Sequence, residues 1–263
     1  MIYNKTFFVE FFAMKFTYDE YLNICTEMFD FVLAAAKRYK LDHNDECYSK
    51  ILRHRTLLSY LLRSSCYECE IFPVEAEEFM TEADKNFDNA CEKFKKIIPA
   101  VAAQNYQTVT QWNAEYGEGM SLHWSVPHPD LAENWCIFHM WNGRRPDSFL
   151  NDKRYFAECF MKIMAESKEK YPQYDTLYTF SWLLSEPRFQ EFFPQEWVDN
   201  MTEPVDFIAA NAGFLGQFIT AKMTLNRKIA TKFIETGKLP FAPRSSHCSF
   251  EAMKKHLKDN IIK

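Results

Sequence analysis

Apolar residues recur at helical spacing through the first part of the chain. From Thr17 to about Lys40 they fall at every third or fourth position, which predicts a helix that buries one apolar stripe. Thr17 and Glu20 are spaced as a capping box, in which each side chain binds a backbone N–H at the start of the helix. Residues 1–13 precede this helix and are interpreted either as part of the fold or as an extension.

The same periodicity continues to about Tyr116. One helix is predicted over about residues 44–66, and a second starts after Pro73 and continues through Phe94 on a single apolar stripe. A further helix is predicted to end near Tyr116, after Pro99 breaks or kinks the preceding one. The first part of the chain is therefore expected to be helical.

A change in composition marks a boundary at Gly117. No glycine occurs before this residue, and only two of the eleven prolines do. Because glycine and proline punctuate loops and turns, we expect a helical N-terminal half over residues 1–116 and a second half with strands and helices over residues 117–263. The predicted fold class is α+β, with the helical half packed on a small mixed β-sheet that carries helices of its own.

Alternation of side chains predicts strands in the second half. Over residues 135–142, odd-numbered side chains face one side and even-numbered side chains face the other. A helix is predicted over about residues 151–170, followed by a strand whose Tyr178, Phe180 and Trp182 are expected to pack on a neighbouring layer. Later in the chain, a helix is predicted to stop at Gly237 and the last one to begin at Ser249.

Composition narrows the class of protein. The net charge is −5 and no dense block of Lys or Arg occurs, so nucleic acid is not an expected partner. No apolar run reaches the length needed to span a bilayer, so a membrane is not expected either. The eight cysteines are scattered and are interpreted as reduced, mostly buried thiols of a cytoplasmic protein. The oligomeric state is left open.

Polar residues follow the strand that contains His139, at a point where a rigid scaffold often presents chemistry. His139 can act as a general base, because neutral imidazole accepts a proton near pH 7, or it can be a half-buried histidine bonded to the backbone. The loop after the strand leads into a helix and could receive an anionic group. The predicted catalytic residues are His139, Asp147 and Ser148. The predicted substrate-binding residues are Trp141, Asn142, Arg144 and Trp182.

Two patterns are compatible with metal or redox chemistry. His123, His128 and His139 lie within seventeen residues, but strong metal-binding spacing such as His-Glu-x-x-His is absent. Cys66 and Cys69 have the spacing of a redox pair or of half a zinc site, yet no second pair accompanies them. No residue is therefore assigned as a metal ligand.

The second half also resembles a known family. It is similar to a GNAT-like acyltransferase-associated domain over a run that begins with Cys136-Ile-Phe-His-Met, continues with Pro146-Asp-Ser-Phe and ends with the segment from Tyr171 to Pro187. Within that segment, Ser-Trp-Leu-Leu at residues 181–184 is the tightest match. By order of elements the similarity covers roughly residues 120–240. The resemblance implies acyl transfer, with acyl-CoA as a candidate cofactor. The Gln/Arg-x-x-Gly-x-Gly/Ala signature that binds the CoA pyrophosphate in that family is absent from this sequence.

These observations lead to three hypotheses. The first is a small-molecule enzyme, with acyl transfer as the reaction, in a cleft between the helical half and the sheet. His139 would be the base, Arg144 would anchor an anion, and Trp141 and Trp182 would line the pocket. The second is a non-catalytic protein whose aromatic cleft holds a ligand or a partner segment. The third is a His-ligated metal enzyme.

Overall fold

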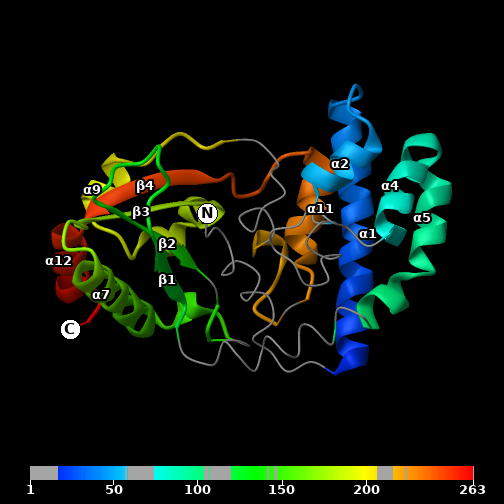
Figure 1. The fold of residues 1–263 in the computed structure, drawn as a ribbon. Coiled ribbons are helices and arrows are strands. Elements are labelled where there is room, and N and C mark those ends of the chain that lie inside the picture. Colours follow the sequence, from blue (N-terminus) through cyan, green and yellow to red (C-terminus); the bar gives the residue numbers. More distant parts are fainter. Residues whose placement is uncertain are drawn as a thin grey trace. The chain divides into compact units, whose positions relative to one another are not determined.

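The computed structural model of the chain describes most of the sequence, in segments (Figure 1). The described residues are 17–56, 58, 74–103, 106, 120–140, 142–144, 147–205, 216–222 and 224–262. Their contacts divide them into two compact units, and each unit is described by itself below. The first unit takes in the described residues before 118 and those from 216 to 240, and the second takes in 120–205 and 241–262.

The first unit is built around helix α1 (Tyr18–Asp42), which contacts α2 (Tyr48–His54) and α11 (Arg227–Thr236) (Figure 1). Helix α2 packs in turn on α4 (Val74–Lys85), and α4 packs on α5 (Phe87–Lys95). Each of these helices is amphipathic, so pairing them buries their apolar stripes together.

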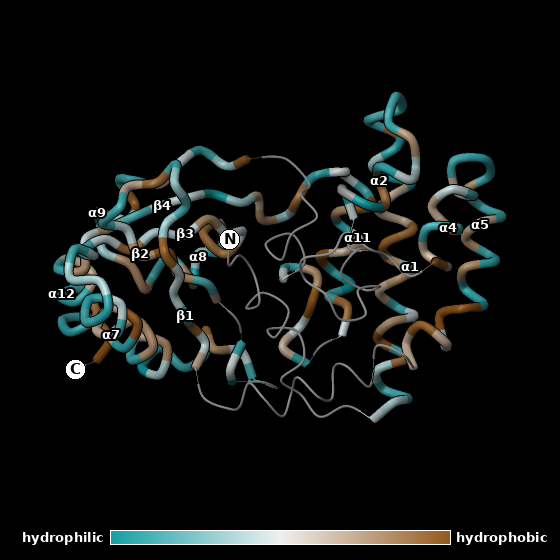
Figure 2. The backbone as a smooth tube through the Cα atoms, in the orientation of Figure 1, coloured by the Kyte–Doolittle hydropathy of each residue, from teal (hydrophilic) through white to brown (hydrophobic). Residues whose placement is uncertain are grey.

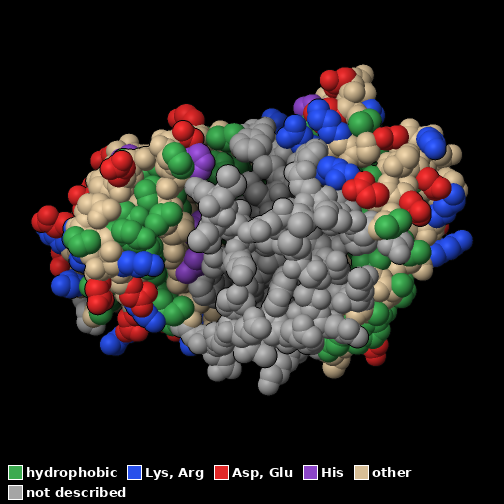
Figure 3. Space-filling view, in the orientation of Figure 1, with side chains coloured by type: hydrophobic (Ala, Val, Ile, Leu, Met, Phe, Trp, Pro, Cys, Tyr) green, Lys and Arg blue, Asp and Glu red, His purple; other side chains and the backbone are tan. Residues whose placement is uncertain are grey.

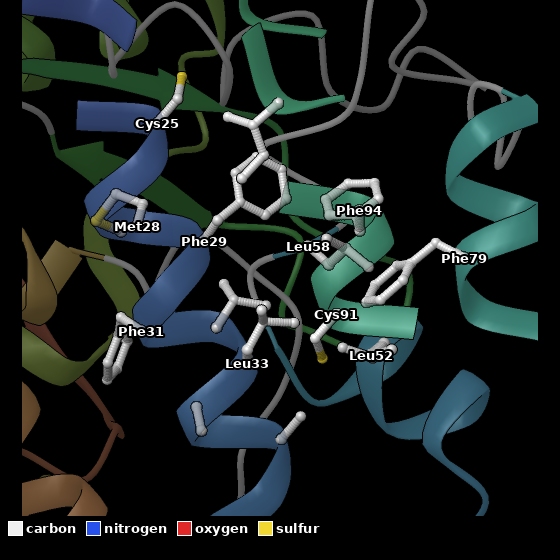
Figure 4. Packing of buried hydrophobic residues seen from close by; sticks show 14 of the residues in the cluster. Cys25, Met28, Phe29, Phe31, Leu33, Leu52, Leu58, Phe79, Cys91 and Phe94 are labelled. Carbon is white, nitrogen blue, oxygen red and sulfur yellow. The ribbon is translucent and has the colours of Figure 1, made fainter. Parts of the chain in front are cut away.

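Aromatic side chains fill the space between these helices. The ring centroids of Phe29 and Phe94 lie 5.0 Å apart, and Phe79 stacks on Phe94 at 4.3 Å. Figure 4 shows the three rings close together, on α1, α4 and α5. All three are buried, so their removal from water stabilises the contact between helices that lie far apart in sequence.

Local capping patterns decide where these helices begin. The predicted capping box is confirmed: Glu20 N donates to Thr17 Oγ1 at 3.3 Å, and Thr17 N donates to Glu20 Oε2 at 2.8 Å. The prediction of one continuous helix after Pro73 is wrong, because Asn86 divides it into α4 and α5. Asn86 Oδ1 accepts the backbone N–H of Asn89 at 3.1 Å, and asparagine is favoured at such N-caps.

Helix α11 ends at Gly237, as its sequence predicts. This glycine has a φ of 70°, in the left-handed region where a residue without Cβ is favoured. A Cβ at this position would lie 2.7 Å from Arg38 Nη2 and 2.7 Å from Asp42 Oδ2 of α1. The glycine therefore both ends α11 and allows its close approach to α1. A short 3-10 helix, η4 (Gly216–Phe218), packs on α11 as well.

The second unit contains a four-stranded mixed sheet within the described part of the chain. In order of pairing, its strands are β1 (Leu122–Ser125), β2 (Trp135–Met140), β3 (Thr176–Ser181) and β4 (Arg244–Ser249). The edge strands β1 and β4 run antiparallel to their neighbours, whereas β2 and β3 are parallel. The parallel pair is joined through helix α7 (Lys153–Lys170), as a parallel connection requires a crossover. The α+β class is thus confirmed.

Helices cover one face of this sheet. α7 contacts β1 and β2, and β4 is contacted by α9 (Gln195–Asp199) and α12 (Phe250–Asn260). Phe138 of β2 meets Phe160 of α7 at a centroid distance of 5.2 Å. Figure 2 shows both hydrophilic and hydrophobic residues along α7, as expected for a helix with one buried face. The remaining short helices are η2 (Phe149–Asn151), η3 (Trp182–Ser185) and α8 (Pro187–Gln190).

The two sides of β3 differ in burial. Leu177 is buried and pairs with Cys136 of β2 and Cys248 of β4, which are buried as well. Tyr178 is half-buried, and Phe180 is 41% exposed. The helices therefore pack on the Leu177 side of β3, and Tyr178 and Phe180 lie on its opposite side. The side that a strand buries follows from its pairing with neighbouring strands, and here that pairing overrides the bulk of the aromatic side chains.

Two further findings bear on the class of protein. None of the helices in the described ranges is both long and apolar enough to cross a membrane. The six cysteines among the described residues are free, and all but Cys47 are buried. Predictions for residues 1–13 and for Cys66 and Cys69 fall outside the described residues.

Candidate functional site

The second face of the sheet carries the candidate chemistry. Side chains alternate along each strand, so those that do not point toward α7, α9 and α12 share the opposite face. We call this set the imidazole face. It consists of His123, Ser125, Trp135, Ile137, His139, Thr176, Tyr178, Phe180, Ser245 and His247.

The imidazole face is chemically distinct from the covered face. None of its residues is fully buried, and none is an Asp, Glu, Lys or Arg. Three histidines lie on it, one each on β1, β2 and β4. Figure 3 shows histidine side chains along one side of this unit. A polar, uncharged and aromatic surface of this kind is suited to binding a ligand rather than to forming a second core.

Strand register sets which of these side chains are neighbours. Ser125 is opposite Ile137, Ile137 is opposite Tyr178, and Tyr178 is opposite His247. These pairs form one continuous row across all four strands. In the adjacent row His123 is opposite His139.

A serine and a histidine are in direct contact on this face. Ser125 Oγ and His139 Nε2 lie 2.9 Å apart, which is a normal hydrogen-bond distance. The two residues are diagonal neighbours on β1 and β2, close enough for a polar side chain to reach. The ring of His123 is stacked on that of His139, with centroids 4.8 Å apart and planes at 23°. The stacking restricts the orientation of the imidazole that faces Ser125.

Both stacked histidines are held in the neutral form at pH 7. Burial lowers the pKa of His139 to about 4. The pKa of His123 is lowered to about 3, first by burial and second by the nearby imidazole of His139. Removing a group from water disfavours its charged form. A neutral His139 can therefore accept a proton from the Ser125 hydroxyl.

A stack of rings lies at the other end of the same face. Trp135 is stacked on Tyr178 and on His247, with a centroid distance of 4.9 Å in each case and interplanar angles of 23° and 24°. Near-parallel, offset rings are a favoured aromatic arrangement. Phe180 follows Tyr178 on this face and is partly exposed to solvent.

Four of the other predicted site residues lie between β2 and α7. Asn142 Nδ2 donates to the backbone oxygen of Asp147 at 2.8 Å, and Ser148 Oγ accepts the N–H of Leu150 at 3.3 Å at the start of η2. Arg144 forms an ion pair with Asp152 at 3.0 Å. The structure thus brings Asn142, Asp147 and Ser148 together in the turn before α7, whereas His139 lies on the strand face with Ser125.

Of the two tryptophans predicted to line the pocket, the structure describes only Trp182. Trp182 lies in η3, beyond the end of β3, and is packed against the hydrophobic core of the second unit. Its ring centroid is 5.8 Å from that of Phe241. Trp141 falls outside the described residues.

Two of the three histidines that suggested a metal site are in contact, whereas the third has a different partner. His128 Nδ1 lies 2.9 Å from Asp130 Oδ2 in an exposed turn, whereas His123 and His139 are stacked on the sheet. Within the ranges that the structure describes, no group of three or more His, Cys, Asp or Glu residues is arranged to hold a metal ion.

Ser125, Trp135, Tyr178 and His247 were not among the residues predicted to form the site. The alternation along β2 does indicate that Trp135 shares a face with His139. No comparable signal marks β4, because its sequence Arg-Ser-Ser-His-Cys-Ser lacks an alternating apolar pattern. The contact between Ser125 and His139 depends on strand pairing, which the local sequence does not specify.

Acid is expected to destabilise the second unit through its two stacked histidines. In the unfolded chain they would take up protons near the ordinary histidine pKa of 6.5, but in the fold they do so only near pH 4 and 3. The unfolded state thus binds more protons in this range, so stability falls as the pH drops from about 6.5 toward 3. The melting temperature measured through this pH range should decline accordingly.

Histidine variants separate this effect from general acid denaturation. The variant His123→Gln lacks one of the two histidines whose pKa is lowered by burial. Its melting temperature should therefore depend less steeply on pH. The matched control His256→Gln changes a histidine of α12 and should retain the wild-type slope. An identical slope in wild type and His123→Gln would contradict the prediction.

No protein-family model, curated protein or solved structure matches the chain. The function proposed below is therefore argued from the geometry of the imidazole face.

Proposed function

We propose that the protein transfers acyl groups from small esters or thioesters, and that the reaction takes place on the imidazole face. The observation that carries the proposal is the 2.9 Å distance between Ser125 Oγ and His139 Nε2. A hydroxyl within hydrogen-bond reach of a neutral imidazole is the arrangement that activates a serine nucleophile. His139 keeps the role of base that its sequence position suggests, and Ser125 supplies the nucleophile.

The reaction consists of two half-reactions. Ser125 Oγ attacks the carbonyl carbon while His139 Nε2 takes up the hydroxyl proton. The bond from this carbon to the leaving oxygen or sulfur then breaks, and the alcohol or thiol departs with the proton from His139. In the second half-reaction, water or another alcohol or amine attacks the acyl-Ser125 ester. His139 takes a proton from this acceptor and returns it to Ser125 Oγ as the acyl group leaves.

The resemblance to GNAT-like acyltransferase-associated domains supports the same reaction class. It makes acyl-CoA a candidate acyl donor, with Arg144 as the predicted anchor for a phosphate group. The guanidinium of Arg144 is paired with Asp152, so a bound phosphate would have to replace this ion pair. Arg144 also lies over the ring of Tyr155, with its guanidinium carbon 5.0 Å from the ring centroid, which would hold it in place during such an exchange.

A ligand-binding protein without catalysis is the alternative function. It is favoured by the stack of Trp135, Tyr178 and His247, because a flat aromatic surface binds planar groups without any chemistry. The two functions differ in whether Ser125 becomes covalently modified.

Trapping the acyl-enzyme tests the proposal. After incubation with p-nitrophenyl acetate, intact-protein mass spectrometry should show the addition of one acetyl group, and peptide mapping should place it on Ser125. Ser125→Ala should lose this modification. The control Ser245→Ala removes a hydroxyl from the same face and should retain it. Acetylation confined to lysine side chains, or unchanged by Ser125→Ala, would exclude a serine nucleophile and leave the binding function.

A further inference from the structure

The row of side chains that begins at Ser125 also includes two members of the ring stack, Tyr178 and His247. Ser125, Ile137, Tyr178 and His247 are paired across β1, β2, β3 and β4 in that order. Neighbouring strands lie about 4.8 Å apart, so the Ser125 and Tyr178 positions are separated by roughly 10 Å. A single small molecule can span this distance. Ile137 lies between them and presents an apolar side chain to it.

The chemistry of the row limits what such a molecule can carry. The ring stack presents aromatic surface from Trp135, Tyr178 and His247, which favours a flat aromatic group. No residue of the imidazole face is acidic or basic, and its two stacked histidines are neutral at pH 7 because burial lowers the pKa of each. A charged group placed here would lose its hydration without gaining an oppositely charged residue of the imidazole face.

We infer that the substrate carries an uncharged acyl group that ends in an aromatic ring and lies along the row from Ser125 to Tyr178. The carbonyl lies at Ser125 Oγ, the alkyl chain crosses Ile137, and the ring rests against Trp135 and Tyr178. This inference deepens the proposed acyl transfer and rests on it for the reaction, but the binding of the aromatic group does not require Ser125. It assigns Trp135 and Tyr178 as specificity-determining residues.

The substrate class is tested with p-nitrophenyl esters that differ only in the acyl group. Wild-type kcat/KM should be about tenfold higher for the phenylbutanoyl ester than for the acetyl ester, as expected for one good aromatic contact. An acyl group of similar length that ends in a carboxylate should show no such gain.

Trp135→Leu should abolish the preference for the phenylbutanoyl ester, and Tyr178→Leu serves as a second variant if Trp135→Leu fails to fold. Trp124→Leu, on the covered face of β1, should retain the preference.

Binding of phenylbutanamide separates this inference from the acyl transfer on which it rests. The amide is uncharged and is not expected to turn over, so calorimetric titration measures the aromatic contact alone. Binding by wild type and by Ser125→Ala, with loss of affinity in Trp135→Leu, would support the ring site even if no ester were hydrolysed. Hydrolysis of the acetyl ester without any preference for the phenylbutanoyl ester, or equal amide affinity in wild type and Trp135→Leu, would overturn it.

Discussion

Replacing His139 by glutamine is expected to slow acyl transfer from small esters by about 100-fold or more. Glutamine can occupy the space and donate or accept a hydrogen bond, but it cannot take up the proton of the Ser125 hydroxyl. The rate of p-nitrophenol release, measured at saturating ester, checks this expectation.

Because burial lowers the pKa of His139 to about 4, the wild-type rate should stay level from neutral pH down to about that value. It should fall only below it, where the imidazole becomes protonated.

Two comparisons make the His139→Gln result interpretable. His256→Gln changes a histidine of α12 and should leave the rate unchanged. The double variant Ser125→Ala with His139→Gln should be no slower than Ser125→Ala alone, because a nucleophile and its base act as one unit. A stable His139→Gln protein with the full wild-type rate would remove His139 from the mechanism. A rate that halves near pH 6.5 instead of near 4 would show that the imidazole is not held neutral.

The largest loss of stability is expected from Phe160→Ala, at about 3–5 kcal/mol. Phe160 is fully buried between the sheet and the segment after α8. Its ring centroid lies 5.2 Å from that of Phe138, 5.1 Å from that of Phe156 and 5.4 Å from that of Phe193. Truncation removes the ring and leaves a cavity at the centre of this cluster. Urea unfolding of the second unit measures the change.

Buried thiols give a readout that is specific to this unit. Cys136 and Cys248 are buried on the covered face of the sheet, so their reaction with a thiol reagent reports its unfolding. The control Val198→Ala changes a residue that is 44% exposed and should alter the free energy of unfolding by less than about 0.5 kcal/mol. If Phe160→Ala cost no more than this control, the aromatic cluster would not be the core of the unit.

Much of the helical structure follows from local sequence. The capping box at Thr17 and the left-handed Gly237 each lie within one turn of the helix end that they define. Ser249 also begins α12 as expected, with its Oγ accepting the N–H of Ala252 at 3.2 Å. Such signals need no distant partner, so they can be recognised before the fold is known. Asn86 is also such a signal, because its side chain caps α5 and divides the segment that apolar spacing alone predicts as one helix.

The candidate site could be predicted only in part. The alternation along β2 places His139 and Trp135 on one face, because side chains of a strand alternate whatever the strand pairs with. The residues of other strands that lie beside His139 and Trp135 are set by the pairing of β1, β2, β3 and β4. These strands are far apart in the sequence. Ser125 therefore came next to His139, and His247 next to Tyr178, only through the register of the sheet.

The sequence alone thus predicted the starts of α1 and α12 and the end of α11, and it selected His139 as a candidate site residue. The tertiary structure decided its partner, its neutral charge state and the role of the following loop. Asp147 and Ser148 follow the strand in sequence, and the structure places them in the turn before α7, where the backbone oxygen of Asp147 and Ser148 Oγ accept hydrogen bonds. The physical reason is that helical periodicity and capping act over a few residues. Strand register and burial depend instead on the whole unit.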